Sequence, residues 1–190
     1  MIRQLIKTLR LLGISLLAGA AWVAHRPADL PRVAAPSSAK ADDLPDMMRQ
    51  TTIKRAAVME VSEVEINRHL SATLSGKIPG VLGGWAAFEG VRIDLEPDTA
   101  RLFLIWKIHG HTQTASVDLA IHRGEKDFRV EVLRGAYGHL EMPRGMMRPL
   151  QPSLQALAEA LDPEIRALFQ MTQITIAKDK LVLDPRFPTA

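Results

Sequence analysis

Cysteine is absent from the 190-residue chain. Disulfide bonds, thiolate metal sites and a lipid-modified cysteine behind a signal segment are therefore excluded. A domain without disulfides relies on its hydrophobic core. A chain of about 150 residues buries roughly 70% of the surface that it exposes when unfolded, which is enough for stability. We therefore expect one domain with a core of its own.

An excess of positive charge is also absent from most of the chain, although the net charge is +3. Three of the 24 lysines and arginines lie in residues 1–20, and none of the 21 acidic residues does. The rest of the chain therefore holds equal numbers of basic and acidic residues, which alternate along it. Nucleic-acid binding requires clustered cations on the folded domain, so we exclude it.

Recognisable catalytic motifs are missing as well. No serine lies in a Gly-x-Ser-x-Gly turn, and no glycine-rich phosphate loop joins an expected strand to an expected helix. Four carboxylates lie close together in the sequence, but the two that flank an expected turn are solvated rather than paired in a cleft. We therefore expect no enzymatic activity and no cofactor. The carboxylates are Glu89, Asp94, Glu96 and Asp98.

Histidines are the remaining candidates for a metal site. His109 and His111 are two residues apart on an expected strand, so they share a face, and His122 could lie on a neighbouring strand. Zinc needs three or four convergent ligands, and this spacing matches no established motif. We therefore predict no metal site. His69 and His139 have no sequence neighbours that indicate a role.

The longest run without a charge lies near the start of the chain. Leu11–Ala24 has no charged residue, and Arg3, Lys7 and Arg10 precede it. A basic flank before an apolar segment is typical of secretory signals and of membrane anchors. The small residues at 18–20 match an A-x-A cleavage pattern, which favours a signal peptide that is removed.

An uncleaved anchor is the alternative that we prefer. Extended back to Leu5, the segment has about 20 residues, enough to span ~30 Å of hydrocarbon with Lys7 and Arg10 at the cytoplasmic rim. Residues 1–25 are then the membrane segment, and the rest of the chain is extracytoplasmic, either periplasmic or at the cell surface. Cleavage would leave the same domain secreted. We therefore predict a single-pass protein of the cell membrane and leave cleavage open.

Residues 26–50 are predicted to be a linker between the membrane and the domain, which comprises residues 51–190. Four prolines and four aspartates interrupt the segment, and it has little apolar periodicity. Such a composition buries too little surface to offset the entropy of ordering, and proline stiffens the chain into a semi-rigid spacer. An ordered segment lying across the domain is the alternative near Met47 and Met48.

The domain is predicted to begin with a short strand and a helix. Ile53–Val61 fits a strand, and Ser62 with Glu65 three residues later fits a capping box at a helix start. The apolar stripe of this helix repeats every four residues and consists of Ile66, Leu70 and Leu74.

From residue 86 to about residue 134 the hydrophobic period shortens to about 2, which predicts an antiparallel meander of four or more strands with one apolar face. Phe103 and Ile105 lie on the other, mostly polar face. They are packed at an edge, covered by the loop at 77–85, or part of a second apolar surface. The apolar face of the same segment carries Leu102, Leu104 and Trp106.

The chain after the meander is predicted to form a loop at 134–138, a second helical region and a closing hairpin. Pro152 lies in the first turn of the helix, where its missing N–H is harmless. Asp162-Pro163 interrupts the helix or starts a new one, and the hairpin covers residues 174–183. The helical stripe includes Leu154, Leu157 and Leu161.

Together these elements indicate an α+β fold: a meander packed on two amphipathic helices and preceded by an N-terminal membrane helix. If the sheet and the helices meet incompletely, an apolar groove remains between them that could hold an acyl chain. If they meet fully, the core is filled. The residues that would line the groove are Ile66, Leu70, Leu74, Leu102, Leu104, Trp106, Leu154, Leu157 and Leu161.

The segment Val61–Leu70 contains the pattern S-x-x-E-I-N-x-x-L, which resembles the corresponding opening of the YpmS-like proteins, a bacterial family with one N-terminal membrane helix. Asn67 is the informative position, because asparagine is a poor helix former. It is either an ordinary solvent-facing side chain or a buried one that bonds the helix to the sheet. The order of elements, the segment Gly138–Pro143 and the closing hairpin are similar to those of tubular lipid-binding domains.

The resemblance implies a membrane-tethered extracytoplasmic domain that binds a lipid or another hydrophobic ligand, and it supplies no catalytic residue. The alternative is an envelope scaffold or interaction protein that has a filled core and binds a protein partner instead.

Overall fold

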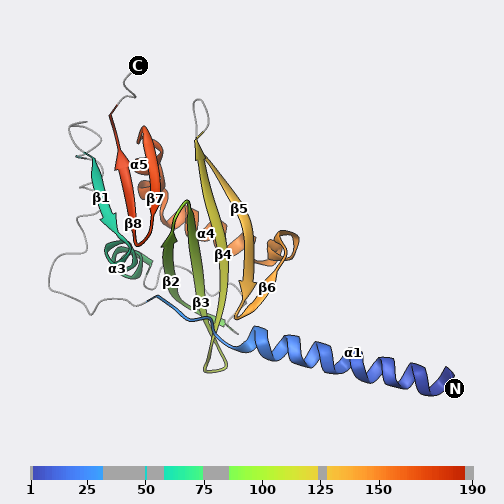
Figure 1. Ribbon diagram of the computed structural model, residues 1–190. Helices are drawn as coiled ribbons and strands as arrows, with labels where there is room; N and C mark the ends of the chain where they lie inside the picture. Colours follow the sequence, from blue (N-terminus) through green and yellow to red (C-terminus); the bar gives the residue numbers. More distant parts are fainter. Residues whose placement is uncertain (1, 32–49, 51–57, 75–85, 124–127, 187–190) are drawn as a thin grey trace.

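The computed structural model describes residues 2–31, 50, 58–74, 86–123 and 128–186. Its helices and antiparallel strands confirm the predicted α+β fold with an N-terminal apolar helix (Figure 1). The predicted loop at 77–85 and most of the predicted linker lie outside the described residues. The elements are α1 (Ile2–His25), β1 (Met59–Ser62), α3 (Glu63–Leu74), β2 (Ala86–Glu96), β3 (Thr99–Ile108), β4 (His111–Arg123), β5 (Phe128–Tyr137), β6 (Leu140–Met142), the 3-10 helix η2 (Arg144–Leu150), α4 (Gln151–Ala160), α5 (Asp162–Phe169), β7 (Gln173–Ala177) and β8 (Lys180–Asp184).

Helix α1 extends away from the rest of the protein (Figure 1). Its stretch Arg3–His25 is long and apolar enough to cross a membrane, and its most apolar window is not buried at all. A helix of the hydrophobic core would be mostly buried, so α1 is not a core helix. A membrane anchor and a signal sequence both fit this exposed, apolar helix.

The strands form two antiparallel sheets. The predicted meander is present as a five-stranded sheet of order β2-β3-β4-β5-β6, in which β6 is an added short edge strand. The predicted first strand begins at Met59 in the described residues; residues 53–57 lie outside them. It pairs with β8, which also pairs with β7, so the closing hairpin and the first strand build a separate three-stranded sheet.

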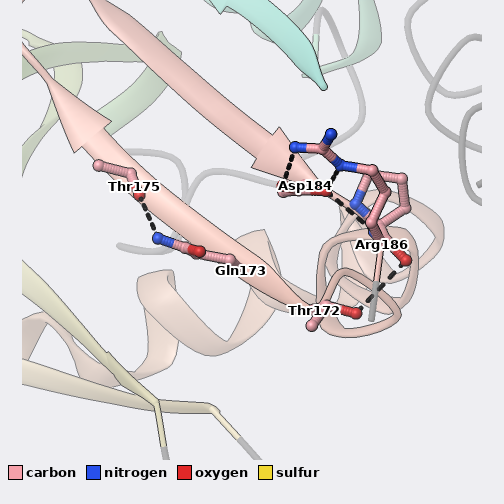
Figure 2. A network of polar contacts seen from close by, with 6 residues as sticks. Thr172, Gln173, Thr175, Asp184 and Arg186 are labelled. Atoms are coloured by element: carbon pink, nitrogen blue, oxygen red, sulfur yellow. Dashed lines mark hydrogen bonds and ion pairs between the residues drawn. The ribbon is translucent and has the colours of Figure 1, made fainter. Parts of the chain in front are cut away.

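A polar network at the end of β8 connects this small sheet to the chain that leads into β7 (Figure 2). Arg186 donates through Nη2 to Asp184 Oδ2 at 2.7 Å. Hydrogen bonds from Arg186 lower the pKa of Asp184 to about 2. The Thr172 hydroxyl donates to the Pro185 carbonyl oxygen at 3.4 Å, and its amide donates to the Asp184 carbonyl oxygen at 2.9 Å. The last described turn is therefore held to the start of the hairpin.

The predicted capping box at the start of α3 is confirmed. Glu65 Oε2 accepts hydrogen bonds from the amide of Ser62 at 2.9 Å and from its hydroxyl at 2.6 Å. The Ser62 Oγ accepts in turn from the Glu65 amide at 3.3 Å. Two backbone donors that have no partner within a helix are thereby satisfied, and the chain turns directly from β1 into α3.

Helix α3 also covers the free edge of β2. There the side chain of Asn67 is buried and bonds the helix to the sheet, which is the second of the two alternatives predicted for it. Its side chain is 0% exposed; Nδ2 donates to the Ile93 carbonyl oxygen at 2.8 Å, and Oδ1 accepts from the Ile93 amide at 2.7 Å. One turn earlier, Glu63 accepts from the Leu95 amide at 2.9 Å. Side chains of the helix therefore replace the neighbouring strand that an edge lacks.

The main core lies on one face of the five-stranded sheet. This first face carries Val91, Leu104 and Val117. Leu70 and Leu74 of α3 pack against it, and so do buried residues of η2 and α4. The predicted break in the second helical region is confirmed, because α4 ends at Ala160 and α5 starts at Asp162 with proline in its first turn. The preceding η2 was not predicted.

The second face of the sheet is buried along β3 as well. Phe103 and Ile105 are only 4% and 6% exposed. Residues 26–31, part of the expected linker, cross this face: the Ala28 amide donates to Thr114 Oγ1 at 2.8 Å, and Leu30 and Ile105 line one cavity. The chain that follows α1 is therefore an ordered strip on the sheet, at least as far as Pro31.

Two local predictions are wrong. His109 and Gly110 do not continue a strand; they are the two residues of the β3–β4 turn, with φ of 49° and 84°. Two consecutive positive φ values match the twist of a hairpin, and glycine allows them at low cost. Residues 134–137 do not form a loop, because β5 continues to Tyr137, where β6 pairs with it.

Candidate functional site

The nine residues predicted to line a groove come together in the main core. Ile66, Leu154 and Leu161 are partly buried and pack against it. The others are buried, with Leu104 fully so at 0% exposure. The sequence therefore identified a set that is contiguous in space, and in the fold these side chains pack against one another. The buried members are Leu70, Leu74, Leu102, Leu104, Trp106 and Leu157.

A group of charged residues lies instead on the second face, where a row of alternating charges crosses four strands. The register places Asp94 of β2 opposite Arg101 of β3, Arg101 opposite Asp118 of β4, and Asp118 opposite Arg134 of β5. Oppositely charged residues in directly opposed positions attract each other across a sheet. The sequence shows the charges, but only the strand register shows that they form one row.

Asp118 is the centre of this row. Its side chain is 4% exposed; Oδ1 and Oδ2 accept from Arg101 at 2.6 and 3.1 Å, and Arg134 Nε donates to Oδ2 at 2.6 Å. Burial alone would raise the pKa of Asp118, but the hydrogen bonds and charges of both arginines outweigh it and hold the pKa below its usual value. The carboxylate is therefore ionised and fixed between two guanidinium groups.

A cavity of about 220 Å³ lies beside this charged centre. Its floor is the second face of the sheet, with Asp118, Phe103 and Ser116, and residues 28–29 form part of its wall. His139 and Glu141, from the β5–β6 turn and β6, line it as well. The cavity therefore lies at the junction where the chain that follows α1 meets the five-stranded sheet.

The junction itself is built from specific contacts. The His139 amide donates to the Val23 carbonyl oxygen at 3.3 Å, and Gln113 Nε2 lies 2.9 Å from His25 Nδ1. Gly138, with φ of 56°, approaches the backbone of residues 24–26 so closely that a Cβ atom would overlap the carbonyl oxygens there. The end of α1 is therefore docked on the sheet.

A second cavity, of about 300 Å³, lies at the edge strand β2 near a β-bulge between Phe88 and Gly90. Leu70 and Leu74 from the predicted groove line it, together with Leu30 of the strip that follows α1. Polar groups share the lining, so this cavity is mixed in character. Two of the nine residues predicted to line a groove therefore line this cavity.

The histidines are scattered among several environments. His25 and His111 face each other at the junction with ring centroids 6.0 Å apart, and His122 Nε2 lies 3.5 Å from a carboxylate oxygen of Glu131. Within the described residues, no group of three or more histidines and carboxylates is placed to hold a metal ion. The geometric pairing of His109 with His111 on one strand face, on which the metal candidate depended, does not occur.

His69 has a partner that the sequence did not indicate. It is 7% exposed on α3, and its Nε2 lies 2.8 Å from Glu164 Oε1 of α5 and 3.2 Å from the Thr73 hydroxyl. The two partners are 95 residues apart, so no local pattern could have found the pair. The contact joins α3 to α5.

Replacing Asp118 with asparagine is expected to cost about 2 kcal/mol of folding stability at pH 7, because an amide cannot accept two charged donors; exposure of the guanidinium groups limits the loss. The pKa of Asp118 is lowered in the folded state, so its contribution is complete above about pH 4 and disappears as the pH falls through the folded value. Urea unfolding at pH 7 and pH 3 checks this. An equal loss at both values would assign the effect to packing instead of charge.

Comparison with known proteins yields no family. The chain matches no protein-family model, and no curated protein sequence matches it. The resemblance to the YpmS-like proteins and to tubular lipid-binding domains therefore stays a prediction.

Proposed function

We propose that this protein is a membrane-tethered extracytoplasmic interaction domain with a filled core, which presents its surface to an envelope partner in a fixed orientation. The observation that carries the proposal is the docked junction. Val23 bonds to His139, Ala28 bonds to Thr114, and Gly138 leaves no room for a side chain. A domain that is held in this way keeps one side toward the membrane and the other toward the surrounding space.

The packing of the nine apolar residues supports a filled core over a lipid carrier. Leu104, at the middle of β3, is completely buried, and its neighbours on α3 and α4 close over it. Carrying an acyl chain requires apolar walls around empty space. In this arrangement the walls contact each other. The proposal assigns the protein no catalytic activity.

The outer edge of β5 is the surface that fits a protein partner. In the part of the chain that the structure describes, strand β6 pairs only with Gly135–Tyr137, and β5 continues beyond it with Val130 and Leu133 exposed at 53% and 46%. A strand edge that carries exposed apolar side chains suits the addition of a strand from another chain.

A photo-crosslinking residue tests this proposal in the native membrane. Placed at Leu133, it is expected to give one discrete adduct with a second protein, whereas the matched position Val64, on α3 and 39% exposed, gives none. Equal patterns at both positions would contradict the proposed partner surface.

Binding of a lipid or another hydrophobic ligand is the second candidate function, because Leu70 and Leu74 of the predicted groove also line the cavity of about 300 Å³. Native mass spectrometry of the full chain distinguishes the two functions. A filled core predicts no stoichiometric adduct after removal from detergent. A one-to-one adduct that is lost on Leu74→Trp would support the lipid function instead.

A further inference from the structure

The short helix η2 carries two consecutive methionines with opposite surroundings. Met147 is 5% exposed and packs against Gly135 of β5, where a Cβ atom would overlap its side chain. Met146 is 57% exposed, although the Tyr137 hydroxyl donates to its carbonyl oxygen at 3.4 Å. One methionine therefore holds η2 on the sheet, and the other is presented to the outside.

The exposed methionine lies between two exposed arginines of the same helix. Arg144 precedes Met146 by two residues and pairs with Glu131 at 3.0 Å, a contact between half-exposed side chains. Arg148 follows it by two residues, and no ion pair of Arg148 occurs within the described part of the chain. An exposed apolar side chain with a cation on either side in sequence fits contact with the headgroups of an anionic bilayer surface.

The position of η2 relative to α1 places the exposed methionine and its two arginines on the side of the domain that faces the membrane. Strand β5 packs against both α1 and η2, and in Figure 1 η2 projects from the side of the sheet toward which α1 extends. Near the end of α1, the Arg26 guanidinium lies 3.8 Å from the centre of the Trp22 ring. Tryptophan is enriched at the boundary between hydrocarbon and headgroups, so Trp22 fits this boundary.

The contacts between α1 and the β5–β6 turn fix how far η2 lies from the membrane surface. Because His139 in the β5–β6 turn is bonded to Val23 of α1, the turn lies at the boundary. Strand β6 has three residues and leads from that turn directly to η2. A strand of that length spans only about 10 Å, comparable to the thickness of the headgroup region.

We propose that η2 is a second membrane contact, in which Met146 enters the interface of the outer leaflet while Arg144 and Arg148 bind lipid phosphates. The inference rests on the proposed membrane tether. It names the bilayer itself as the partner of this surface: the exposed apolar area is one side chain, too small for a protein interface, and the flanking charge complements anionic headgroups.

The absence of cysteine makes the test direct. Met146→Cys, labelled with a fluorophore, is placed in the full chain in vesicles with brominated acyl chains. Gln173→Cys, at an exposed position on β7, is the matched control, and Ser15→Cys reports insertion of α1. We expect the quenching at position 146 to exceed that at position 173 by about twofold or more, as interfacial insertion requires.

Each outcome is decisive. Quenching at position 15 with equal, weak quenching at positions 146 and 173 would overturn the contact of η2 and leave the tether intact. Weak quenching at all three positions would overturn the tether and the contact together.

The role of the arginines is tested on the same background. Arg144→Gln with Arg148→Gln is expected to lower the quenching at position 146 in vesicles that contain anionic lipid, whereas Arg166→Gln on α5 leaves it unchanged. Unchanged quenching in the double variant would remove the phosphate contacts from the proposal.

Discussion

Asn67→Ala is expected to destabilise the domain by about 2–5 kcal/mol, because it leaves two partly buried backbone groups without partners at about 1–3 kcal/mol each. The side chain satisfies both the amide and the carbonyl oxygen of Ile93, and it is 0% exposed, so water cannot replace it without opening the structure. Urea unfolding of the full chain in detergent micelles, followed by the fluorescence of the buried Trp106, measures the loss.

Ser71→Ala is the matched control for this experiment. Ser71 lies one turn later on α3, and among the described residues its hydroxyl bonds only to the helix's own backbone, to the Asn67 carbonyl oxygen at 2.8 Å. The expected change is within about 0.5 kcal/mol, as for other exposed positions. Similar losses for both variants would mean that Asn67 contributes helix propensity and no bridge to the sheet.

Gly138→Ala is expected to release the end of α1 from the sheet. The new Cβ atom would overlap the carbonyl oxygens of Ala24 and Arg26, which are backbone atoms and cannot rotate away. The amides of His139 and Ala28, bonded to Val23 and Thr114, should then lose hydrogen-exchange protection by about tenfold or more, equivalent to about 1.4 kcal/mol of local stability.

Gly110→Ala separates this steric effect from backbone strain. Gly110 also has a positive φ, 84°, but a Cβ atom there meets no atom within 4 Å. Its replacement therefore costs conformational strain alone, and the protection of His139 and Ala28 should stay at its original level. Loss of protection in both variants would show that the domain has softened as a whole and that the junction has no special role.

The local patterns of the sequence predicted the elements well where one physical signal was strong. The alternation of apolar residues gave the meander, and Ser62 with Glu65 gave the start of α3. Predictions failed where side chains were considered without backbone geometry. His109 was placed on a strand because it continues the alternating pattern of residues 101–107, yet Gly110 after it allows the tight turn.

The candidate site was less accessible to prediction because its parts are distant in sequence. Asp118 and Arg134 are 16 residues apart, and a bulge in the β4–β5 register decides that they meet. His69 and Glu164 are separated by most of the domain. A single sequence contains the charges and their alternation, but pairing across strands and helices depends on register, which no local period encodes.

The sequence by itself determined the exposed apolar helix α1, the neutral charge of the rest of the chain, the absence of disulfides and the α+β order of elements, because composition and periodicity act locally. The tertiary structure alone decided that the chain after α1 lies on the sheet and that Phe103 and Ile105 are buried on the same face. It also decided that Asp118 is held between two arginines. These features arise where segments far apart in the chain meet. Burial at these places strengthens the contacts, because water competes less for the interacting groups.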